Sequence, residues 1–366
     1  MGKERNVGID LLRILAMCMV VFLHVLAQGG VINNALAISK LHYYTQKSIQ
    51  TIAYCAVNCY AIISGFVGVG RKWKISSLIS LLFTVLFYTV GFSFIFYILK
   101  PQEIGLVGMF KAMLPDYWYV MAYCGLFFFM PILNRFIETA SRETCFASIG
   151  WLFLVLSCTS PIFAIMGQDP FHLSEGFSML WLMVLYLVGG YLKIYGINVK
   201  HVKAKMWILF AVCIAVTFLS KVATNVLGYP DLNILYYYTS PTIFLASIAL
   251  VVIFSNLNIK SGKKQRITYF ATFTFAIYLI HQQELVNLYC IQDQFVWVLD
   301  LHWALSIAAT LGCAIAVCII CTIIDIMRFY LFKLCRVDKL VSLCQKIFDK
   351  IDAWIFKKIG IKQEEE

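Results

Sequence analysis

The chain has 366 residues, of which 61% are hydrophobic and 13% are charged. About a quarter of the residues of a soluble globular protein are charged, so this composition excludes an ordinary soluble domain. The excess apolar surface has to face lipid. The length therefore predicts many membrane spans rather than several soluble domains.

The net charge of +11 does not indicate a nucleic-acid partner, because the basic residues are not gathered on one helix or face. The 13 cysteines lie mostly inside apolar runs, where cysteine acts as a small hydrophobic residue. The single C-x-x-C, from Cys318 to Cys321, has neither a second pair nor a nearby histidine. No metal site, redox motif or disulfide framework is therefore predicted.

Runs of about 20 apolar residues, long enough to cross a bilayer as a helix, occur ten times. The predicted spans cover residues 8–28, 48–69, 77–99, 117–137, 146–166, 177–195, 206–226, 234–256, 268–289 and 303–327. The first span resembles a signal peptide in length, but Asp10 and Arg13 interrupt its apolar core, which favours a retained span. The expected fold class is all-α, a polytopic transmembrane bundle of about ten helices.

The segment from Arg336 to Ile361 differs from the spans, because Lys and Asp separate its apolar residues. The apolar residues recur at helical spacing, at Leu340, Leu343, Ile347, Ile351 and Trp354. This pattern is typical of a helix that lies on a membrane surface. We therefore predict a transmembrane domain over residues 1–331 and a cytosolic, amphipathic and charged tail over 332–366.

The Lys and Arg residues orient the predicted spans. With the N-terminus in the cytosol, 24 of the 30 lie in cytosolic loops or at the span ends beside them, and five lie outside. The remaining one, Arg13, lies within the first span. This alternation follows the positive-inside rule and predicts that both termini are cytosolic.

Arg13 and His24 are the polar residues of the first span that most need an explanation, since a charge in a span costs about 2.5–3.5 kcal/mol on insertion scales. Eleven residues separate them, which is three helical turns plus about 20°, so both lie on one face. Along the helix they are roughly 16 Å apart. Arg13 is expected in the inner half of the membrane, and His24 near the outer surface.

Structural interpretations compete with a functional one here. Arg13 could pair with Asp10, three residues earlier on the same face, and His24 could be a hydrogen-bonded interface residue. Other polar groups in spans favour a shared cavity: Asn58, Ser64, Trp118, Tyr123, His281 and Glu284. Within F-T-F-A-I-Y-L-I-H-Q-Q-E-L-V, a continuous helix would place His281 and Glu284 on adjacent turns.

Four short motifs follow one another along the chain. They are D-x-x-R followed by ten residues and H (Asp10, Arg13, His24), S-G-F (Ser64 to Phe66), W-Y-x-x-A-Y leading to P-x-L-N (Trp118 to Asn134), and Y-L-x-H (Tyr278 to His281). Together with ten spans they resemble the acyltransferase type 3 family, integral-membrane enzymes that acylate carbohydrates and related hydroxyl-bearing acceptors. The bacterial branch that modifies polysaccharides is the most similar.

Two positions depart from the family pattern. Phe275 stands where an earlier tyrosine of the last motif is usual. The entry to the third span carries Arg71, Lys72 and Lys74 but lacks the proline that commonly follows. A phosphate-binding role for that loop is open, because a solvated loop that sets topology explains the same basic residues.

The resemblance implies an acyl-CoA donor, most simply acetyl-CoA, on the cytosolic side of a bacterial cell membrane, and no metal. The acceptor would be a hydroxyl of a surface glycan or lipid-linked carbohydrate, with membrane lipid as the other partner. His24 would act as general base, and Arg13 would hold a donor phosphate or carbonyl oxygen. The basic loop would bind CoA, and Asp10, Ser64, Trp118, Tyr123, His281 and Glu284 would support the site or line the acceptor path. An acyl-serine at Ser64 ranks below direct transfer, since S-G-F is not a nucleophile elbow.

Transport is the rival function. A polar stripe across ten spans could line the path of an exported polysaccharide or a flipped lipid-linked sugar. A receptor or scaffold, in which the polar residues only join helices, is a weaker alternative. Export would leave the mass of the acceptor unchanged, whereas acylation adds one acyl group.

Overall fold

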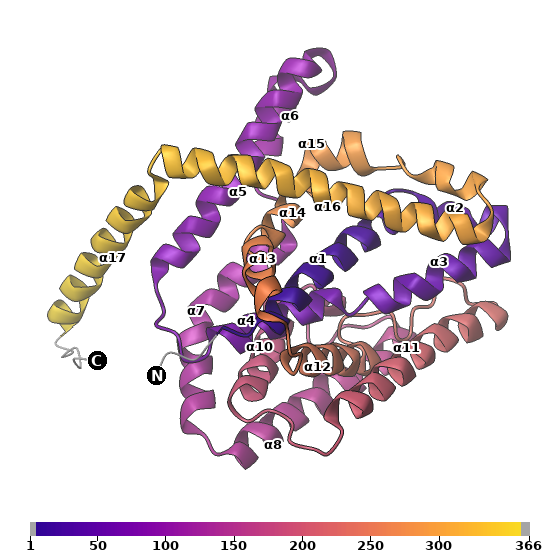
Figure 1. The fold of residues 1–366 in the computed structure, drawn as a ribbon, viewed down its shortest axis with the longest axis horizontal. Coiled ribbons are helices and arrows are strands. Elements are labelled where there is room, and N and C mark those ends of the chain that lie inside the picture. The colour runs from indigo at the N-terminus through magenta and orange to yellow at the C-terminus, as the bar shows by residue number, and fades with distance from the viewer. Residues whose placement is uncertain (1–4, 360–366) are drawn as a thin grey trace.

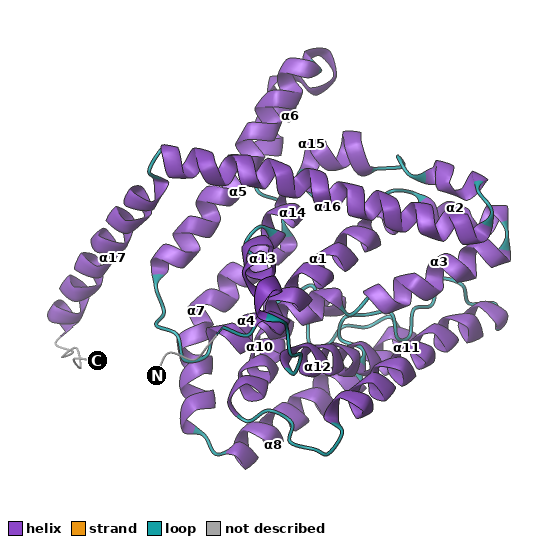
Figure 2. Cartoon of the chain, viewed as in Figure 1, coloured by secondary structure: helices purple, strands orange, loops and turns teal. Residues whose placement is uncertain are grey.

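The computed structural model describes residues 5–359, which form helices joined by loops and contain no strand (Figure 2). The first half contains α1 (Val7–Ala27), α2 (Val31–Ile38), α3 (Lys40–Ala53), α4 (Ala56–Gly68), α5 (Ile75–Leu99), α6 (Pro101–Met113), α7 (Trp118–Thr139), α8 (Arg142–Leu152) and α9 (Ser160–Met166). The second half contains α10 (Met179–Ile194), α11 (Val202–Val226), α12 (Pro241–Ser255), α13 (Ser261–Ala271), α14 (Thr274–His281), α15 (Glu284–Val286), α16 (Trp303–Leu334) and α17 (Val337–Ile359). The predicted all-α fold class is confirmed.

Seven helical stretches are long and apolar enough to cross a membrane. They correspond to seven of the predicted spans, at residues 7–27, 40–68, 75–99, 101–139, 142–166, 202–226 and 303–334. Two more predicted spans correspond to the apolar but shorter helices α10 and α12. Helix α12 begins late because Pro241 occupies its first turn, where the missing N–H is tolerated.

The predicted span 268–289 is interrupted, which corrects the expectation of one continuous helix. Helix α14 ends at His281, and the side chain of Gln283 then caps α15 by accepting hydrogen bonds from the backbone N–H groups of Leu285 and Val286. Glu284 is therefore not on the next turn of the helix that carries His281. Residues 282–284, where the helix is interrupted, line a pocket described below.

Helix α1 lies at the centre of the bundle, where it contacts α2, α3, α4, α12, α13, α14 and α16 (Figure 1). Its buried residues include Leu12, Ala16, Val21 and Leu26. Arg5 before α1 and the loops at 69–74 and 256–260 lie at one end of the bundle, which we call the basic end. Gln28, the loop 114–117 and residues 282–302 lie at the opposite end.

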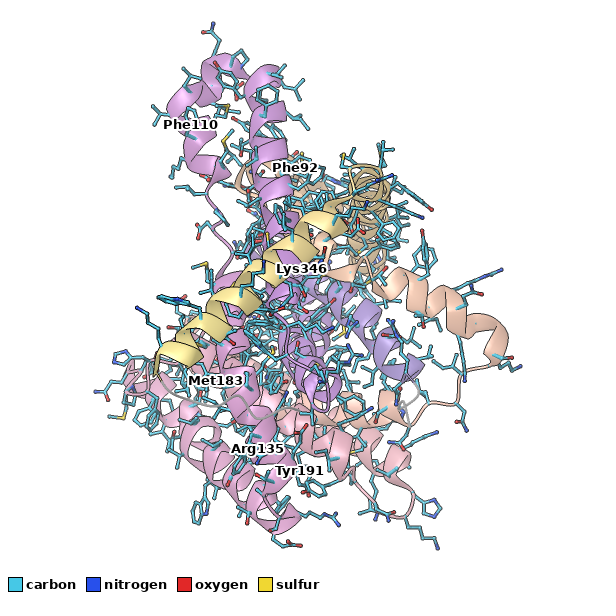
Figure 3. All side chains as sticks on the ribbon, turned by 90° about the vertical axis from the view of Figure 1, so that its left-hand side faces the viewer. Phe92, Phe110, Arg135, Met183, Tyr191 and Lys346 are labelled. Carbon is cyan, nitrogen blue, oxygen red and sulfur yellow. The ribbon has the colours of Figure 1, made fainter. Side chains whose placement is uncertain are left out.

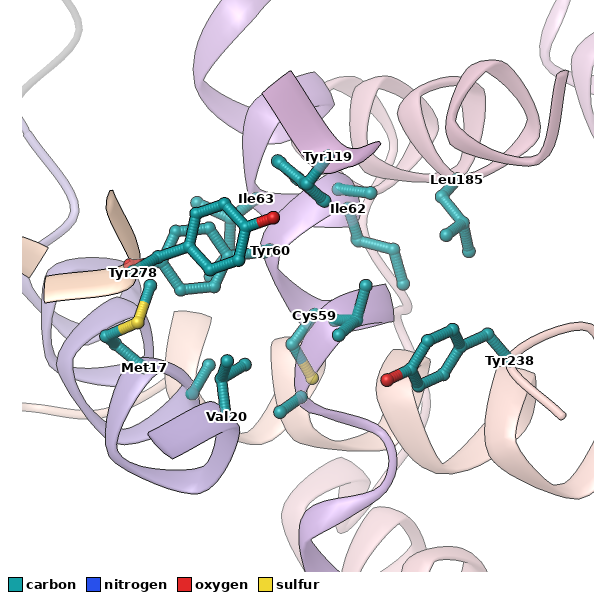
Figure 4. Close-up of a cluster of buried hydrophobic side chains, with 14 of the residues drawn as sticks. Met17, Val20, Cys59, Tyr60, Ile62, Ile63, Tyr119, Leu185, Tyr238 and Tyr278 are labelled. Carbon is teal, nitrogen blue, oxygen red and sulfur yellow. The ribbon is translucent and has the colours of Figure 1, made fainter. Parts of the chain in front are cut away.

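Glycines bring α4 and α10 into close contact. A Cβ atom at Gly65 would lie 2.0 Å from the carbonyl oxygen of Tyr186, and one at Gly189 would lie 1.9 Å from that of Ile62. Small residues allow helix backbones to approach in this way. Figure 4 shows Ile62 of α4 and Leu185 of α10 in the resulting apolar cluster, together with Met17 and Val20 of α1.

Helix α17 extends from the end of α16 and lies beside α5 (Figures 1 and 3). The side chain of Gln345 accepts a hydrogen bond from the backbone N–H of Ser76, and Phe348 contacts the Trp73 ring. The stripe of Leu340, Leu343, Ile347, Ile351 and Trp354 is exposed. Its contact with a membrane surface stays a prediction, as does the division at residue 331, which falls three residues before α16 ends. Residues 360–366 of the predicted tail lie outside the described range.

We expect Gly65→Ala to lower the free energy of unfolding by about 1–3 kcal/mol, the usual penalty for forcing a group into a packed core. Gly91 on α5 is the matched control, because nothing lies within 4 Å of a Cβ placed there. Gly91→Ala should leave stability unchanged or raise it by up to about 1 kcal/mol through helix propensity. Thermal unfolding in detergent measures both, and equal transition temperatures for the two variants would contradict the close contact.

Candidate active site

Two histidines from distant parts of the chain form a direct hydrogen bond. The Nδ1 atom of His24, in the last turn of α1, lies 2.7 Å from the Nε2 atom of His281, the last residue of α14. His281 is 1% exposed, whereas His24 is partly exposed. The structure thus joins two of the residues that the sequence proposed for the site.

A backbone carbonyl fixes which nitrogen of each neutral ring carries the proton. The Nδ1 atom of His281 lies 2.6 Å from the carbonyl oxygen of Ile277. A carbonyl can only accept, so His281 carries its proton on Nδ1 and presents an unprotonated Nε2. The proton between the rings then belongs to Nδ1 of His24. Consequently, the Nε2 atom of His24 carries a lone pair, and it has no hydrogen-bond partner among residues 5–359.

A cavity of about 460 Å³ opens at the basic end, and we call it the arginine cavity. Arg13 lines it, together with Ser64 and Tyr123 and the basic loop after α4. The other polar residues in its wall include Tyr60, Tyr119, Asn134 and Thr274. The cavity therefore brings together one predicted site residue from each of spans one, two and four, namely Arg13, Ser64 and Tyr123.

Asp10 interacts with two arginines, and the shorter contacts are not with Arg13. The Nε and Nη2 atoms of Arg5 donate to the two oxygens of Asp10 over 2.6 and 3.0 Å, a bidentate pair of the stronger kind. Arg13 approaches the same carboxylate only to 3.7 Å. Arg13 therefore keeps only a longer contact with Asp10, and it also lines the arginine cavity.

Two tyrosine hydroxyls in the wall of the arginine cavity are unsatisfied. The hydroxyls of Tyr60 and Tyr119 are buried, and neither meets hydrogen-bonding geometry with any residue in the described range. A buried hydroxyl without a partner is unfavourable by about 1–3 kcal/mol. The Tyr119 ring contacts that of Tyr278, which in turn contacts His281 (Figure 4 shows Tyr60, Tyr119 and Tyr278). Both residues line the cavity, and each hydroxyl keeps an unused donor.

A second cavity, of about 290 Å³, lies at the opposite end, and we call it the amide pocket. Five side-chain amides line it, from Gln28, Gln282, Gln283, Asn287 and Gln292. Its two carboxylates belong to Asp116 and Glu284, and its remaining walls come from α5, α6, the loop before α7 and Leu288. Glu284 lines this pocket rather than orienting a histidine, and Lys111 Nζ lies 3.9 Å from it.

Two segments independently place the histidine pair between these cavities. On α1, Arg13 lines the arginine cavity and Gln28 lines the amide pocket, and His24 lies between them. From α14 onward, Phe275 lines the arginine cavity and Gln282 lines the amide pocket, and His281 lies between them. The two cavities share no lining residue in the described range.

A larger groove of about 1400 Å³ adjoins the arginine cavity and is called here the basic groove. The two share Lys72, Trp73, Lys74 and Thr272. Helix α17 forms one wall, and the basic residues of the groove are Lys72, Lys74, Arg328, Lys333, Arg336, Lys339 and Lys346 (Figure 3 labels Lys346). Arg71 lines the arginine cavity but not the basic groove. Asp338 and Asp349 also line the groove, but the basic residues outnumber them, and this excess of positive charge favours an anionic ligand.

Three other residues that the sequence predicted for the site are Ser64, Tyr123 and Trp118. The Ser64 hydroxyl donates to the carbonyl oxygen of Tyr60 within α4 and lines the arginine cavity. Tyr123 stacks beside Tyr119. The Trp118 ring packs against Phe177, 4.6 Å between centroids, and lines neither the arginine cavity nor the amide pocket. Among the described residues, no three His, Cys, Asp or Glu side chains group into a metal-ligand set.

The described residues thus form a helical bundle with candidate membrane spans, in which a histidine pair lies between two cavities. A sequence profile of the acyltransferase domain matches residues 6–325. The chain therefore belongs to the acyltransferase 3 family and is a multi-pass membrane acyltransferase. No curated protein and no solved structure gives a match to the chain.

The histidine pair makes a spectroscopic prediction. At a pH where the rings are neutral, His24 and His281 should both carry their proton on Nδ1. His42 is the internal control: its Nε2 lies 2.9 Å from the carbonyl oxygen of Leu301, so it should carry its proton on Nε2. Long-range proton–nitrogen correlation of ¹⁵N-histidine-labelled protein, assigned with single His→Gln variants, measures this. An Nε2–H form of His281 would contradict this assignment of the protons in the histidine pair.

Proposed function

We propose that the protein transfers an acyl group, preferentially acetyl, from cytosolic acyl-CoA to a hydroxyl of a surface glycan or its lipid-linked precursor. The observation that carries the proposal is the position of the histidine pair between a basic cavity and an amide-lined pocket. An anionic donor would meet the basic residues at one end of the bundle. An acceptor rich in hydroxyls would meet the side-chain amides at the other end.

The donor end of the proposal rests on charge and shape. CoA carries phosphates at one end and a thioester on a slender arm at the other. The basic groove would hold the phosphates, and the adjoining arginine cavity would admit the arm past Lys72 and Lys74. Arg13, a fixed cation whose fork geometry suits phosphate and carbonyl oxygens, lies further along the same path.

The orientation of the protein in the membrane follows from the same residues. The basic end carries most of the Lys and Arg residues, and the positive-inside rule assigns such an end to the cytosol. Ten spans with both termini inside a bacterial cell membrane would then place the amide pocket at the outer side. The short helices α10 and α12 and the interrupted segment α13–α15 would supply the three crossings beyond the seven long helical stretches.

The proposed reaction begins at the Nε2 atom of His24, which takes the proton of the acceptor hydroxyl. The oxygen attacks the thioester carbon, and the carbonyl becomes a tetrahedral oxyanion. The carbon–sulfur bond then breaks, and the CoA thiolate recovers the proton from His24. The products are an ester and free CoA. His281 keeps accepting the hydrogen bond from Nδ1 of His24, which holds the ring in the productive tautomer.

The tetrahedral oxyanion needs hydrogen-bond donors, which sequence analysis did not identify. The unsatisfied hydroxyls of Tyr60 and Tyr119 are suited to this role. They lie in the wall of the arginine cavity, and Tyr119 is linked to His281 through the Tyr278 ring. Donors already in place when the charge develops stabilise a transition state without reorganisation.

Acyl transfer accounts for the arrangement better than export of a polysaccharide. The two cavities share no lining residue among those described, and the hydrogen-bonded histidines lie between them. Direct transfer would require only that one hydroxyl and the thioester carbon meet beside the histidine pair. A polysaccharide path would require the central helices α1 and α14 to separate.

We expect His24→Gln to reduce transfer of labelled acetyl from acetyl-CoA to a cell-envelope glycan extract by about 10²–10⁴-fold, the range of general-base contributions. His42→Gln is the matched control and should retain activity, since His42 lies at the start of α3 away from both cavities. Scintillation counting of the purified glycan gives the rate. Full activity of a folded His24→Gln variant would exclude the proposed base, and a glycan of unchanged mass would favour export.

The tyrosine donors make a separate prediction. Tyr119→Phe and Tyr60→Phe should each lower kcat by about 10²–10³-fold, as removal of an oxyanion donor does. Neither should lower thermal stability by much, because neither hydroxyl makes a well-aligned hydrogen bond, and its neighbour is Thr274 for Tyr60 and Ser64 for Tyr119. Tyr186→Phe is the contrasting control, since its hydroxyl donates to Asn134 over 2.8 Å and its loss should reduce stability. Unchanged kcat in both tyrosine variants would refute the oxyanion role.

A further inference from the structure

We propose that the amide pocket binds the acceptor as a single uncharged sugar ring and directs one of its hydroxyls toward Nε2 of His24. The inference rests on the proposed acyl transfer and adds the chemical class of the acceptor unit. It is carried by the volume, the hydrogen-bonding groups and the charge of the pocket, and by two lining residues, Gln28 and Gln282, that lie close to His24 and His281 in the chain.

The volume limits what the pocket can hold. At about 290 Å³ it lies at the lower edge of the range of about 300–1,000 Å³ that is typical of small-molecule sites. One pyranose ring fits such a space, whereas a chain of several sugars would have to extend out of it. The pocket therefore recognises one unit of a larger acceptor.

The lining amides match the hydrogen-bonding character of sugar hydroxyls. A side-chain amide both donates and accepts, and so does a hydroxyl. The Gln28 and Gln282 amides are paired reciprocally, with Nε2–Oε1 distances of 3.2 and 2.7 Å. Asn287 donates to the same Gln28 oxygen over 2.8 Å. The network holds these amides in place, so their remaining donors and acceptors are presented in fixed directions.

Gln283 has a different role from the other amides. It is 1% exposed, its oxygen caps α15, and its nitrogen lies 3.3 Å from both Ser93 Oγ and the Ala112 carbonyl oxygen. Its hydrogen bonds therefore fix the backbone that carries Gln282 and Glu284. Gln28, Gln282, Asn287 and Gln292 are left to contact a ligand.

The charge of the pocket selects against anionic acceptors. Asp116 and Glu284 are the charged side chains in its described lining, and both are acidic. Lys111 reaches Glu284 only at 3.9 Å and is 76% exposed, so solvent screens that pair. A uronic acid or a phosphate-bearing unit would meet uncompensated negative charge. A neutral ring would instead find two strong acceptors for its hydroxyl protons.

The position of the pocket relates it directly to the proposed base. Gln28 follows His24 by one helical turn, and residues four apart lie on the same face. Gln282 follows His281 immediately, where α14 ends. Neither histidine lines the pocket itself, so a ring held by these two amides would contact residues that adjoin the histidine pair.

The test uses purified protein in lipid nanodiscs, labelled acetyl-CoA, and two acceptors of the same ring, methyl glucopyranoside and methyl glucopyranosiduronate. We expect kcat/KM to be at least about tenfold higher for the neutral glycoside, which corresponds to about 1.4 kcal/mol. Asp116→Asn combined with Glu284→Gln preserves shape and should reduce that preference. Gln282→Leu should raise the KM for the neutral glycoside about tenfold and leave the KM for acetyl-CoA unchanged. Gln294→Ala, an exposed amide outside the pocket, should change neither.

Several results would overturn the assignment. They are an equal or higher kcat/KM for the uronide, an unchanged acceptor KM in Gln282→Leu, or an unchanged preference in the double carboxamide variant. Transfer to neither glycoside, by protein that still acetylates a cell-envelope glycan extract, would overturn the single-ring site as well. Failure of wild-type protein to transfer acetyl to any acceptor would instead overturn the proposed function.

Discussion

The hydrogen bond between His24 and His281 is the interaction on which the rest of the site depends. It joins the first span to a helix about 250 residues later in the chain, and the Ile277 carbonyl fixes its direction. These two hydrogen bonds leave one nitrogen, Nε2 of His24, as the available base. In a serine hydrolase a carboxylate orients the catalytic histidine. Here a second, neutral histidine bonded to a carbonyl would do so, which avoids placing another charge in the membrane.

The surroundings of Arg13 also limit uncompensated charge within the membrane. An arginine in a span is unfavourable unless it is paired or hydrated, and Asp10 provides partial pairing. Arg5 takes the shorter contacts with Asp10, and Arg13 keeps a longer contact with the same carboxylate while it lines the arginine cavity. The two interpretations of Arg13 that the sequence left open, a structural partner of Asp10 and a functional cation, are therefore compatible.

Much of the fold could be predicted because lipid imposes a strict length and composition on each span. The shared face of Arg13 and His24 was also predictable, because it depends only on helix geometry within one segment. The interruption after His281 was not, because it depends on Gln283 bonding to Ser93 and to the Ala112 carbonyl oxygen, more than 150 residues away. The Gln28–Gln282 pair and the unsatisfied hydroxyls of Tyr60 and Tyr119 arise only when distant helices pack. The run His281-Gln282-Gln283-Glu284 was the one local signal of the amide pocket.

The central claim is that the histidine pair joins a donor on one side of the membrane to an acceptor on the other. Sealed proteoliposomes test it most directly, with labelled acetyl-CoA enclosed in the lumen and the acceptor glycan supplied only outside. The account predicts label on the external glycan, dependent on His24, from the molecules whose basic end faces the lumen. Transfer that occurs only when both substrates share one compartment would contradict it.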